Sequence, residues 1–259
     1  MALRIGFDLD GVFADMESEL VRQSEILFGE PMTRRLQQPA ADGGDTPAAA
    51  VANAPAAGSP DPAPDLAPDP APDLAPPVAR LNMTSRQQRR LWHHVESIEN
   101  FWEGLEELEP GVIQRLASIA NDRRWEIIFL TKRPETVGAT AQVQSQRWLE
   151  SKGFTLPSVF VVQGSRGRIA ASLGLDIVVD DRPENCLDVV VDSKARAILV
   201  WRADESQLPA AAQRLGIGVV KSVADCLEIL TQVDSASRDE PGVMTRVMRL
   251  LGFKQPASM

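Results

Sequence analysis

Two carboxylates stand two residues apart near the start of the chain. Asp8 and Asp10 follow residues 3–7, whose alternating apolar side chains predict a short β-strand, and Gly11 comes directly after them. Side chains at positions i and i+2 of an extended backbone lie on one face, so both acids can point into one small site. Because two like charges held this close repel each other, a bound divalent cation is their usual partner. The spacing therefore predicts a catalytic element.

Two more polar stretches follow apolar runs later in the chain. Residues 131–134 (TKRP) come after WEIIFL, and residues 180–183 (DDRP) come after DIVV. Arg166 stands between them, near the start of a predicted helix. The carboxyl ends of parallel strands meet at one edge of a sheet, where such folds bind ligands. We therefore expect both stretches and Arg166 to converge with Asp8 and Asp10.

The residue types in these stretches suit phosphoryl transfer. Carboxylate oxygens are ligands that Mg²⁺ prefers, and a hydroxyl together with a guanidinium can hold a phosphate. One carboxylate can attack phosphorus and form an aspartyl-phosphate, which divides a difficult step into two. A second carboxylate can protonate the leaving alkoxide and then activate a water molecule. The set predicts a phosphate-handling enzyme with Mg²⁺ as its cofactor.

The elements that must position these residues alternate between strand and helix. Later strands are predicted over residues 125–131, 158–162, 176–179, 197–201 and 217–220. Helices are predicted over residues 111–119, 135–152, 166–173, 183–194 and 222–230. Such alternation is typical of the α/β class, so we expect a Rossmann-like parallel sheet with helices on both faces.

With these motifs in this order, the chain resembles the haloacid-dehalogenase-like phosphatase superfamily. It has DxDGV, then an apolar strand that ends in Thr131, then a basic residue, then the pair at 180–181. Within the superfamily, DLDGV, LTKRP and VDDRPEN are most similar to the 5'(3')-deoxyribonucleotidase-like branch. The resemblance covers residues 2–36 and 81–230.

The resemblance implies a role for each of the four acids. Asp8 would be the nucleophile and a metal ligand. Asp10 would be the general acid and base, with its backbone carbonyl on the metal. Asp180 would coordinate Mg²⁺, and Asp181 would act directly or through a water molecule.

The resemblance also implies that basic and hydroxyl side chains bind the phosphate, namely those of Thr131, Lys132 and Arg166. Lysine is commoner than arginine at the position of Arg166 in the relatives, and Arg168 is the alternative for this position. Lys132 and Arg133 could steer an anionic substrate. Arg133 could equally be an exposed loop charge, and Lys132 could instead pair with the acids.

The expected activity is hydrolysis of phosphomonoesters, with Mg²⁺ and an aspartyl-phosphate intermediate. The branch resemblance favours nucleoside monophosphates, deoxy ones in particular. One alternative is the same chemistry on sugar or other small phosphates. The other is a non-catalytic binding or scaffold protein that uses its proline-rich insert and basic tail.

A small helical cap is expected directly after the first strand, interrupted by an insert of low complexity. The predicted parts are the core (1–14 and 105–232), the helical cap (15–36 and 81–104), the insert (37–80) and a C-terminal tail (233–259). In the cap, Trp92, Phe101 and Trp102 could stack on a base or simply pack, and we favour packing. His93 and His94 are neighbours and face different directions, which favours packing over metal binding.

The insert and the tail differ in composition from the rest. Eleven of the 19 prolines lie between positions 39 and 77, and the octapeptide at 61–68 (DPAPDLAP) repeats at 69–76. Such a segment lacks the apolar area to offset the entropy of ordering it, so we expect a disordered spacer, with an interaction ligand as the alternative. In the tail, residues 243–254 show an amphipathic helical pattern that could dock on the domain, a partner or an acidic membrane surface.

Composition limits the class of protein. The 259 residues carry a net charge of −9, which argues against a nucleic-acid polymer as partner. Cys186 and Cys226 are expected to be buried free thiols in a reducing compartment. No signal-peptide pattern and no apolar run long enough for a membrane span is seen. We therefore expect a cytoplasmic protein whose partner is a small phosphorylated substrate, and a homodimer is left open.

Overall fold

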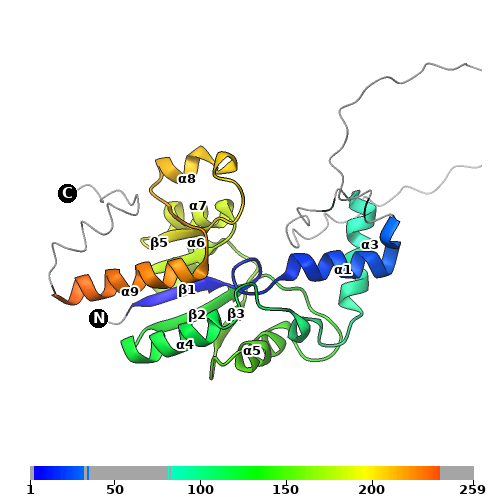
Figure 1. Ribbon diagram of the computed structural model, residues 1–259, viewed down its shortest axis with the longest axis horizontal. Helices are drawn as coiled ribbons and strands as arrows, with labels where there is room; N and C mark the ends of the chain where they lie inside the picture. The colour runs from blue at the N-terminus through cyan, green and yellow to red at the C-terminus, as the bar shows by residue number, and fades with distance from the viewer. Residues whose placement is uncertain (1–2, 32–33, 35–80, 82, 240–259) are drawn as a thin grey trace, which may run out of the picture.

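The computed structural model describes residues 3–31, 34, 81 and 83–239. In these residues, six parallel strands form one sheet in the order β3-β2-β1-β4-β5-β6 (Figure 1). The strands are β1 (Arg4–Asp8), β2 (Glu126–Thr131), β3 (Ser158–Val161), β4 (Ile177–Asp180), β5 (Arg196–Val200) and β6 (Gly218–Val220). The predicted α/β class with a Rossmann-like parallel sheet is confirmed.

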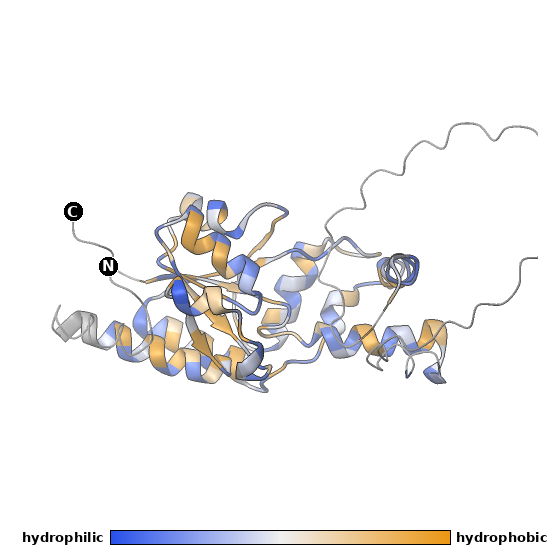
Figure 2. Ribbon diagram, turned by 90° about the horizontal axis from the view of Figure 1, so that it is seen from above, coloured by the Kyte–Doolittle hydropathy of each residue, from blue (hydrophilic) through white to orange (hydrophobic). Residues whose placement is uncertain are grey.

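Helices cover both faces of the sheet. They are α4 (Val112–Arg123), α5 (Ala141–Ser151), α6 (Arg166–Leu173), α7 (Pro183–Asp192), α8 (Ala210–Arg214) and α9 (Val223–Asp239). Ile177 and Val179 of β4 belong to the core cluster formed with α4, α5 and α9, whereas Val178 belongs to the cluster formed with α6, α7 and α8. This division follows from the alternation of side chains along a strand. In Figure 2 the strands are mostly hydrophobic, whereas the helices carry both hydrophobic and hydrophilic residues.

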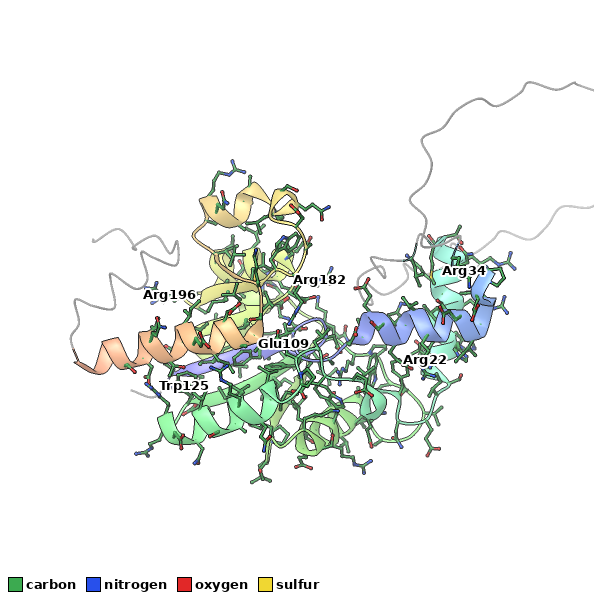
Figure 3. The ribbon with its side chains drawn as sticks, in the orientation of Figure 1. Arg22, Arg34, Glu109, Trp125, Arg182 and Arg196 are labelled. Carbon is green, nitrogen blue, oxygen red and sulfur yellow. The ribbon has the colours of Figure 1, made fainter. Side chains whose placement is uncertain are left out.

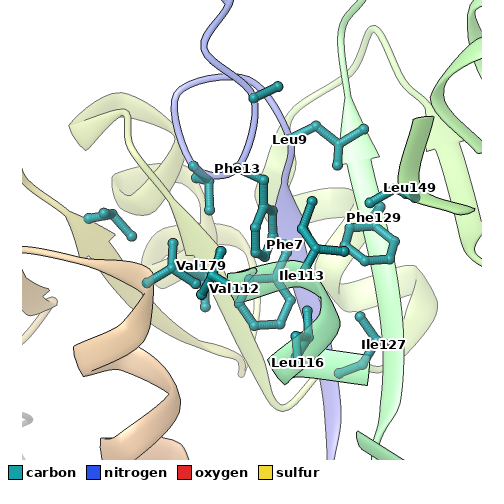
Figure 4. Close-up of a cluster of buried hydrophobic side chains, with 14 of the residues drawn as sticks. Phe7, Leu9, Phe13, Val112, Ile113, Leu116, Ile127, Phe129, Leu149 and Val179 are labelled. Atoms are coloured by element: carbon teal, nitrogen blue, oxygen red, sulfur yellow. The ribbon is translucent and has the colours of Figure 1, made fainter. Parts of the chain in front are cut away.

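Three phenylalanines anchor the end of β1 in the core. The ring of Phe13, from the loop after β1, lies 5.4 Å from that of Phe7 and 5.9 Å from that of Phe129 in β2, measured between centroids. Figure 4 shows these rings packed with Ile113 and Leu116 of α4. Because all five residues are buried, the loop that carries Asp10 is fixed on both sides of its turn.

The segment between β1 and α4 contains three helices, α1 (Met16–Phe28), α3 (Ser85–Glu96) and the 3₁₀-helix η1 (Phe101–Gly104). α1 and α3 form a separate group, whereas η1 packs on α5. His94 Nε2 lies 3.1 Å from Gln23 Oε1, and the guanidinium of Arg90 lies over the ring of Phe28 at 5.5 Å, so α1 and α3 pack on each other. The arrow of β1 points toward this group in Figure 1, which places α1 and α3 beyond the carboxyl ends of the strands. The predicted insert at 37–80 and the amphipathic segment at 243–254 lie outside the described residues.

One helix begins later than predicted. The pattern indicated a helix over residues 135–152, but residues 135–140 form a loop and α5 begins at Ala141. Long-range hydrogen bonds hold this loop: Asn100 N donates to Val137 O at 2.7 Å, and Val137 N donates to Glu96 O at 3.0 Å. The side chain of Thr140 then accepts from Val143 N and caps α5.

The last helix is longer than predicted. It was expected over residues 222–230, but α9 continues to Asp239, past the residue at which the tail was expected to begin. Arg123 Nη1 in α4 lies 3.1 Å from Asp234 Oδ2, and Asp234 is buried. This contact fixes the added turns of α9 against α4. The short helix α8 and the 3₁₀-helix η2 (Glu205–Gln207) were not predicted.

Two smaller expectations concern burial. Cys186 and Cys226 are both free and buried, as predicted. Within the described part of the chain, no helix combines the length and the apolar character that a membrane crossing needs.

Candidate active site

Three predicted site residues lie at the ends of adjacent strands. Asp8 ends β1, Thr131 ends β2 and Asp180 ends β4, and β1 pairs with both β2 and β4. Neighbouring strands lie about 4.8 Å apart, so the register brings these three side chains to one edge of the sheet. Figure 3 marks this edge by Glu109 and Arg182, whereas Arg196 lies at the opposite, amino-terminal end of the strands.

Gly11 lets the fourth acid, Asp181, lie close to the loop after β1. Gly11 has φ +81°, a left-handed conformation that glycine adopts without strain, and a Cβ at this position would overlap the carboxylate of Asp181. The glycine in DLDGV therefore lets the loop after β1 and the loop after β4 pack closely. As a result, Asp181 lies near Asp8 and Asp10 although they are far apart in sequence.

A charged pair that sequence reasoning missed fixes the loop after β1. Arg202 donates to Gly11 O at 2.5 Å and to Glu109 Oε1 at 2.6 Å. Glu109 also accepts from the backbone N–H groups of Val223 and Ala224 at 2.8 and 3.0 Å, where α9 begins. Glu109 therefore links four segments, and no local sequence pattern connects it with Arg202, 93 positions away.

Arg166 is the cation between the acids of β1 and β4. Its Nη2 donates to Asp8 Oδ1, and its Nε lies 3.5 Å from Asp180 Oδ2. The side chain is 2% exposed, yet Nε and Nη1 have no hydrogen-bond partner. Arg168, the alternative for this position, is exposed. Of these two arginines, Arg166 is the one that contacts the acids.

Burial raises the pKa of three of the acids. Burial raises the pKa of Asp8 well above its usual range, against the lowering effect of Arg166, and burial likewise raises the pKa of Asp180. Burial and the charge of Asp180 raise the pKa of Asp181 to about 8. Asp180 is also oriented by Asn185, whose Nδ2 lies 3.0 Å from both of its carboxylate oxygens. These carboxylates are short of positive charge.

Asp10 is held by a different arginine. Arg133 Nε lies 3.0 Å from both oxygens of Asp10, Arg133 Nη2 lies 2.7 Å from Oδ1, and the hydroxyl of Thr131 donates to Oδ2 at 3.0 Å. Arg133 is 2% exposed, so the expectation of an exposed loop charge is wrong. Lys132, which was expected to bind phosphate or pair with the acids, is only partly buried.

Two aromatic residues of the predicted cap pack against α5 and the loop after β2. Phe101 and Trp102 are buried, and Trp102 Nε1 donates to Pro134 O at 2.9 Å. The favoured interpretation, packing, is therefore confirmed for these two residues, and neither presents a face for a base. His94 contacts Gln23, and the side chain of His93 is 90% exposed.

The acids suit Mg²⁺ in type and charge but not in their present arrangement. Oxygen donors fit the ion, and four acids face two buried arginines, which leaves negative charge in excess. In the described segments, however, no three His, Cys, Asp or Glu side chains are grouped so that they could hold a metal ion. Arg166 contacts both Asp8 and Asp180, the two acids expected to share the ion.

Comparisons with known proteins bear on the fold. No protein-family model matches the chain, and no curated protein matches its sequence. Among solved structures, it is similar to one from Thermotoga maritima described as "putative beta-phosphoglucomutase", with 17% identity and a TM-score of 0.50, over 89% of this chain and 99% of that chain. At this identity the likeness shows the fold alone. It agrees with the Rossmann-like α/β class described above.

Proposed function

We propose that the protein is a phosphomonoester hydrolase that works through an aspartyl-phosphate on Asp8. The observation that carries the proposal is the buried guanidinium of Arg166, which forms ion pairs with Asp8 and Asp180 and has no hydrogen bond at Nε or Nη1. Buried donors without partners are costly, and the oxygens of a phosphate would satisfy them. A scaffold protein that never binds an anion has no use for this arrangement.

The proposed reaction has two steps. A carboxylate oxygen of Asp8 attacks phosphorus, the bond between phosphorus and the ester oxygen breaks, and Asp10 gives a proton to the leaving alkoxide. A water molecule then attacks the phosphorus of the acyl-phosphate, gives its proton to Asp10, and releases inorganic phosphate and Asp8. Arg166 binds the phosphoryl oxygens and offsets charge on them. The hydroxyl of Thr131, which donates to Asp10 in the structure, would turn to donate to a phosphoryl oxygen instead.

Mg²⁺ is part of this proposal. Asp8, Asp180 and Asp181 would hold the ion together with the backbone carbonyl of Asp10, once Arg166 shares its two acids with it. When bound, the ion supplies charge neutralisation for the transferring phosphoryl group. Burial raises the pKa values of Asp8, Asp180 and Asp181 because it disfavours their charged forms, and a bound cation would offset this cost.

Two substrate classes follow from different observations. The motifs DLDGV, LTKRP and VDDRPEN favour nucleoside monophosphates through their resemblance to the nucleotidase-like branch. The name of the structural neighbour, a phosphoglucomutase, favours sugar phosphates. The helices between β1 and α4 are proposed to act as the cap that selects the leaving group. A screen of nucleoside and sugar monophosphates, with and without Mg²⁺, separates the two classes.

The test of the proposed function is Asp8→Asn. Turnover of phosphomonoesters should fall to background because an amide is no nucleophile toward phosphorus, and the phosphorylated peptide seen after acid quenching should be lost. The melting temperature should change little, since the pKa of Asp8 is raised in the fold and a neutral group is tolerated there.

Asp15→Asn is the matched control, since Asp15 caps α1 rather than lying at a strand end. It should leave turnover within about threefold of wild type. Full activity of Asp8→Asn, or a phosphorylated peptide that lacks residue 8, would rule out the assignment.

A further inference from the structure

Arg133 makes several close contacts with Asp10 that the sequence did not predict. Two of its nitrogens reach the carboxylate, with distances of 2.7 Å from Nη2 to Oδ1 and 3.0 Å from Nε to each oxygen. A guanidinium is a planar fork, so such a contact fixes the orientation of the carboxylate as well as its place. The side chain of Asp10 is 12% exposed, whereas that of Arg133 is 0% exposed. The arginine therefore holds the acid from behind.

Arg133 is itself held in place by three neighbouring side chains. Its Nη1 donates to Ser145 Oγ in α5 at 2.9 Å. Its guanidinium lies over the rings of Trp102 and Trp148, with 5.0 and 5.6 Å between Cζ and the ring centroids. Both indole N–H groups donate to backbone carbonyls, so the rings are themselves fixed. A group this restrained is preorganised, because little freedom remains to be lost when it orients a partner.

Stability alone does not explain this pair. A buried ion pair can often be replaced by apolar side chains without loss of stability, because the desolvation of both charges offsets their attraction. Arg133 pairs with an acid at the strand ends, beside Thr131, rather than with an acid in the core between sheet and helices.

We infer that Arg133 is a positioning residue for the proton transfer by Asp10. It acts through Asp10 and does not touch the substrate. This inference rests on the proposed function, since it assigns a role within that reaction. Loss of Arg133 should therefore lower kcat/KM most for substrates whose leaving group must be protonated.

The experiment compares two substrates of similar shape, phenyl phosphate and 4-nitrophenyl phosphate. Nitrophenolate is a much weaker base than phenolate and leaves without a proton, so only phenyl phosphate depends on the general acid. General acid–base catalysis contributes about 10²–10⁴-fold. Arg133→Met should therefore lower kcat/KM for phenyl phosphate by about 30-fold or more. It should lower kcat/KM for 4-nitrophenyl phosphate by less than about threefold, the pattern also expected of Asp10→Asn.

Two further variants separate positioning from folding. Arg133→Lys keeps a charge at the site but loses the fork, so its ratio of the two kcat/KM values should lie between those of wild type and Arg133→Met; this variant carries the test if Arg133→Met does not fold. Arg123→Met is the control, because Arg123 pairs with Asp234 on the far side of the core and its loss should leave the ratio unchanged.

The outcomes distinguish the two proposals. An active wild type whose ratio does not change in folded Arg133→Met and Arg133→Lys overturns the positioning role and leaves the proposed function intact. A wild type that hydrolyses neither phosphate, with or without Mg²⁺, overturns the proposed function and with it the role of Arg133.

Discussion

Each acid of the DxD motif meets its own buried arginine. Asp8 pairs with Arg166 from the start of α6, and Asp10 pairs with Arg133 from the loop after β2. The two pairs differ in what the arginine has left to offer. Arg133 has its nitrogens engaged by Asp10 and Ser145, whereas Nε and Nη1 of Arg166 make no hydrogen bond. Under the proposed function, Arg133 positions an acid and Arg166 binds the phosphate.

The raised pKa of Asp181 predicts how the stability of the fold depends on pH. Burial raises the pKa of Asp181 to about 8 in the folded protein, whereas the unfolded chain releases this proton near the ordinary value of 3.8. Folding therefore binds a proton between these values, so stability falls as pH rises from about 4 to about 8 and then levels. In metal-free protein, the melting temperature should fall between pH 5 and pH 8. Each kcal/mol lost corresponds to about 2–4 °C for a chain of this size.

Asp181→Asn should flatten part of this slope, because the amide has no proton to release. Mg²⁺ added at pH 8 should raise the melting temperature of wild type more than that of the variant, since the ion and the proton compete for the same carboxylates. Identical slopes in wild type and variant, measured by differential scanning calorimetry with and without chelator, would contradict the assignment of the raised pKa to Asp181.

At the scale of elements, α6 must be placed closely for Arg166 to reach the strand ends. Gly167 follows Arg166, and a Cβ on it would overlap the backbone carbonyl of Asp188 and press on Asp192 in α7. The glycine therefore sets the distance between α6 and α7. Its neighbour Arg166 depends on that distance for its contacts with Asp8.

Gly167→Ala should lower stability by about 1–3 kcal/mol, the usual cost of overpacking, and should lower turnover further by moving Arg166. Chemical denaturation and kcat on one phosphomonoester measure the two effects. Gly164→Ala is the matched control, because an added Cβ there meets nothing within 4 Å. Equal behaviour of the two variants would mean that the α6–α7 contact does not set the site.

The strands and most helices could be predicted because their signals are local. A run such as IIFL in β2 reports burial directly, and Gly174 ends α6 as its position after an apolar pattern suggests. The partner of Asp10 could not be predicted, because Arg133 lies 123 positions away and its burial depends on two tryptophans from other elements. The late start of α5 has the same cause: Val137 bonds to the cap segment, and no pattern within residues 135–152 records that contact.

At the scale of the whole molecule, the helices between β1 and α4 are tied to the core at more than their two ends. Asp15 N donates to Glu106 O at 2.9 Å, where the outgoing and returning segments run side by side. The loop after β2 adds a third connection through Val137, which bonds to residues 96 and 100. These ties fix the helices next to the strand ends, and α1 then runs away from the sheet (Figure 1).

Because α1 leads away from the strand ends, the segment that follows it is expected to be dispensable for chemistry. Replacing residues 37–79 by a flexible linker of about ten residues should leave kcat/KM within about threefold, since Asp8, Thr131 and Asp180 stand on strands of the core. The matched comparison is a chain in which these residues are shuffled at constant length. Loss of turnover in the shortened chain alone, with an unchanged melting temperature, would show that the segment takes part in catalysis.

The stacking of Trp102 and Trp148 on Arg133 has an optical consequence. The chain contains five tryptophans and no tyrosine, so indole dominates its fluorescence, since phenylalanine emits only weakly. Two of those five fluorophores touch a charge that is bound to Asp10. A ligand that changes the ion pair between Arg133 and Asp10 also changes the electric field at both rings. Tryptophan fluorescence of the wild-type protein should therefore report ligand binding near Asp10.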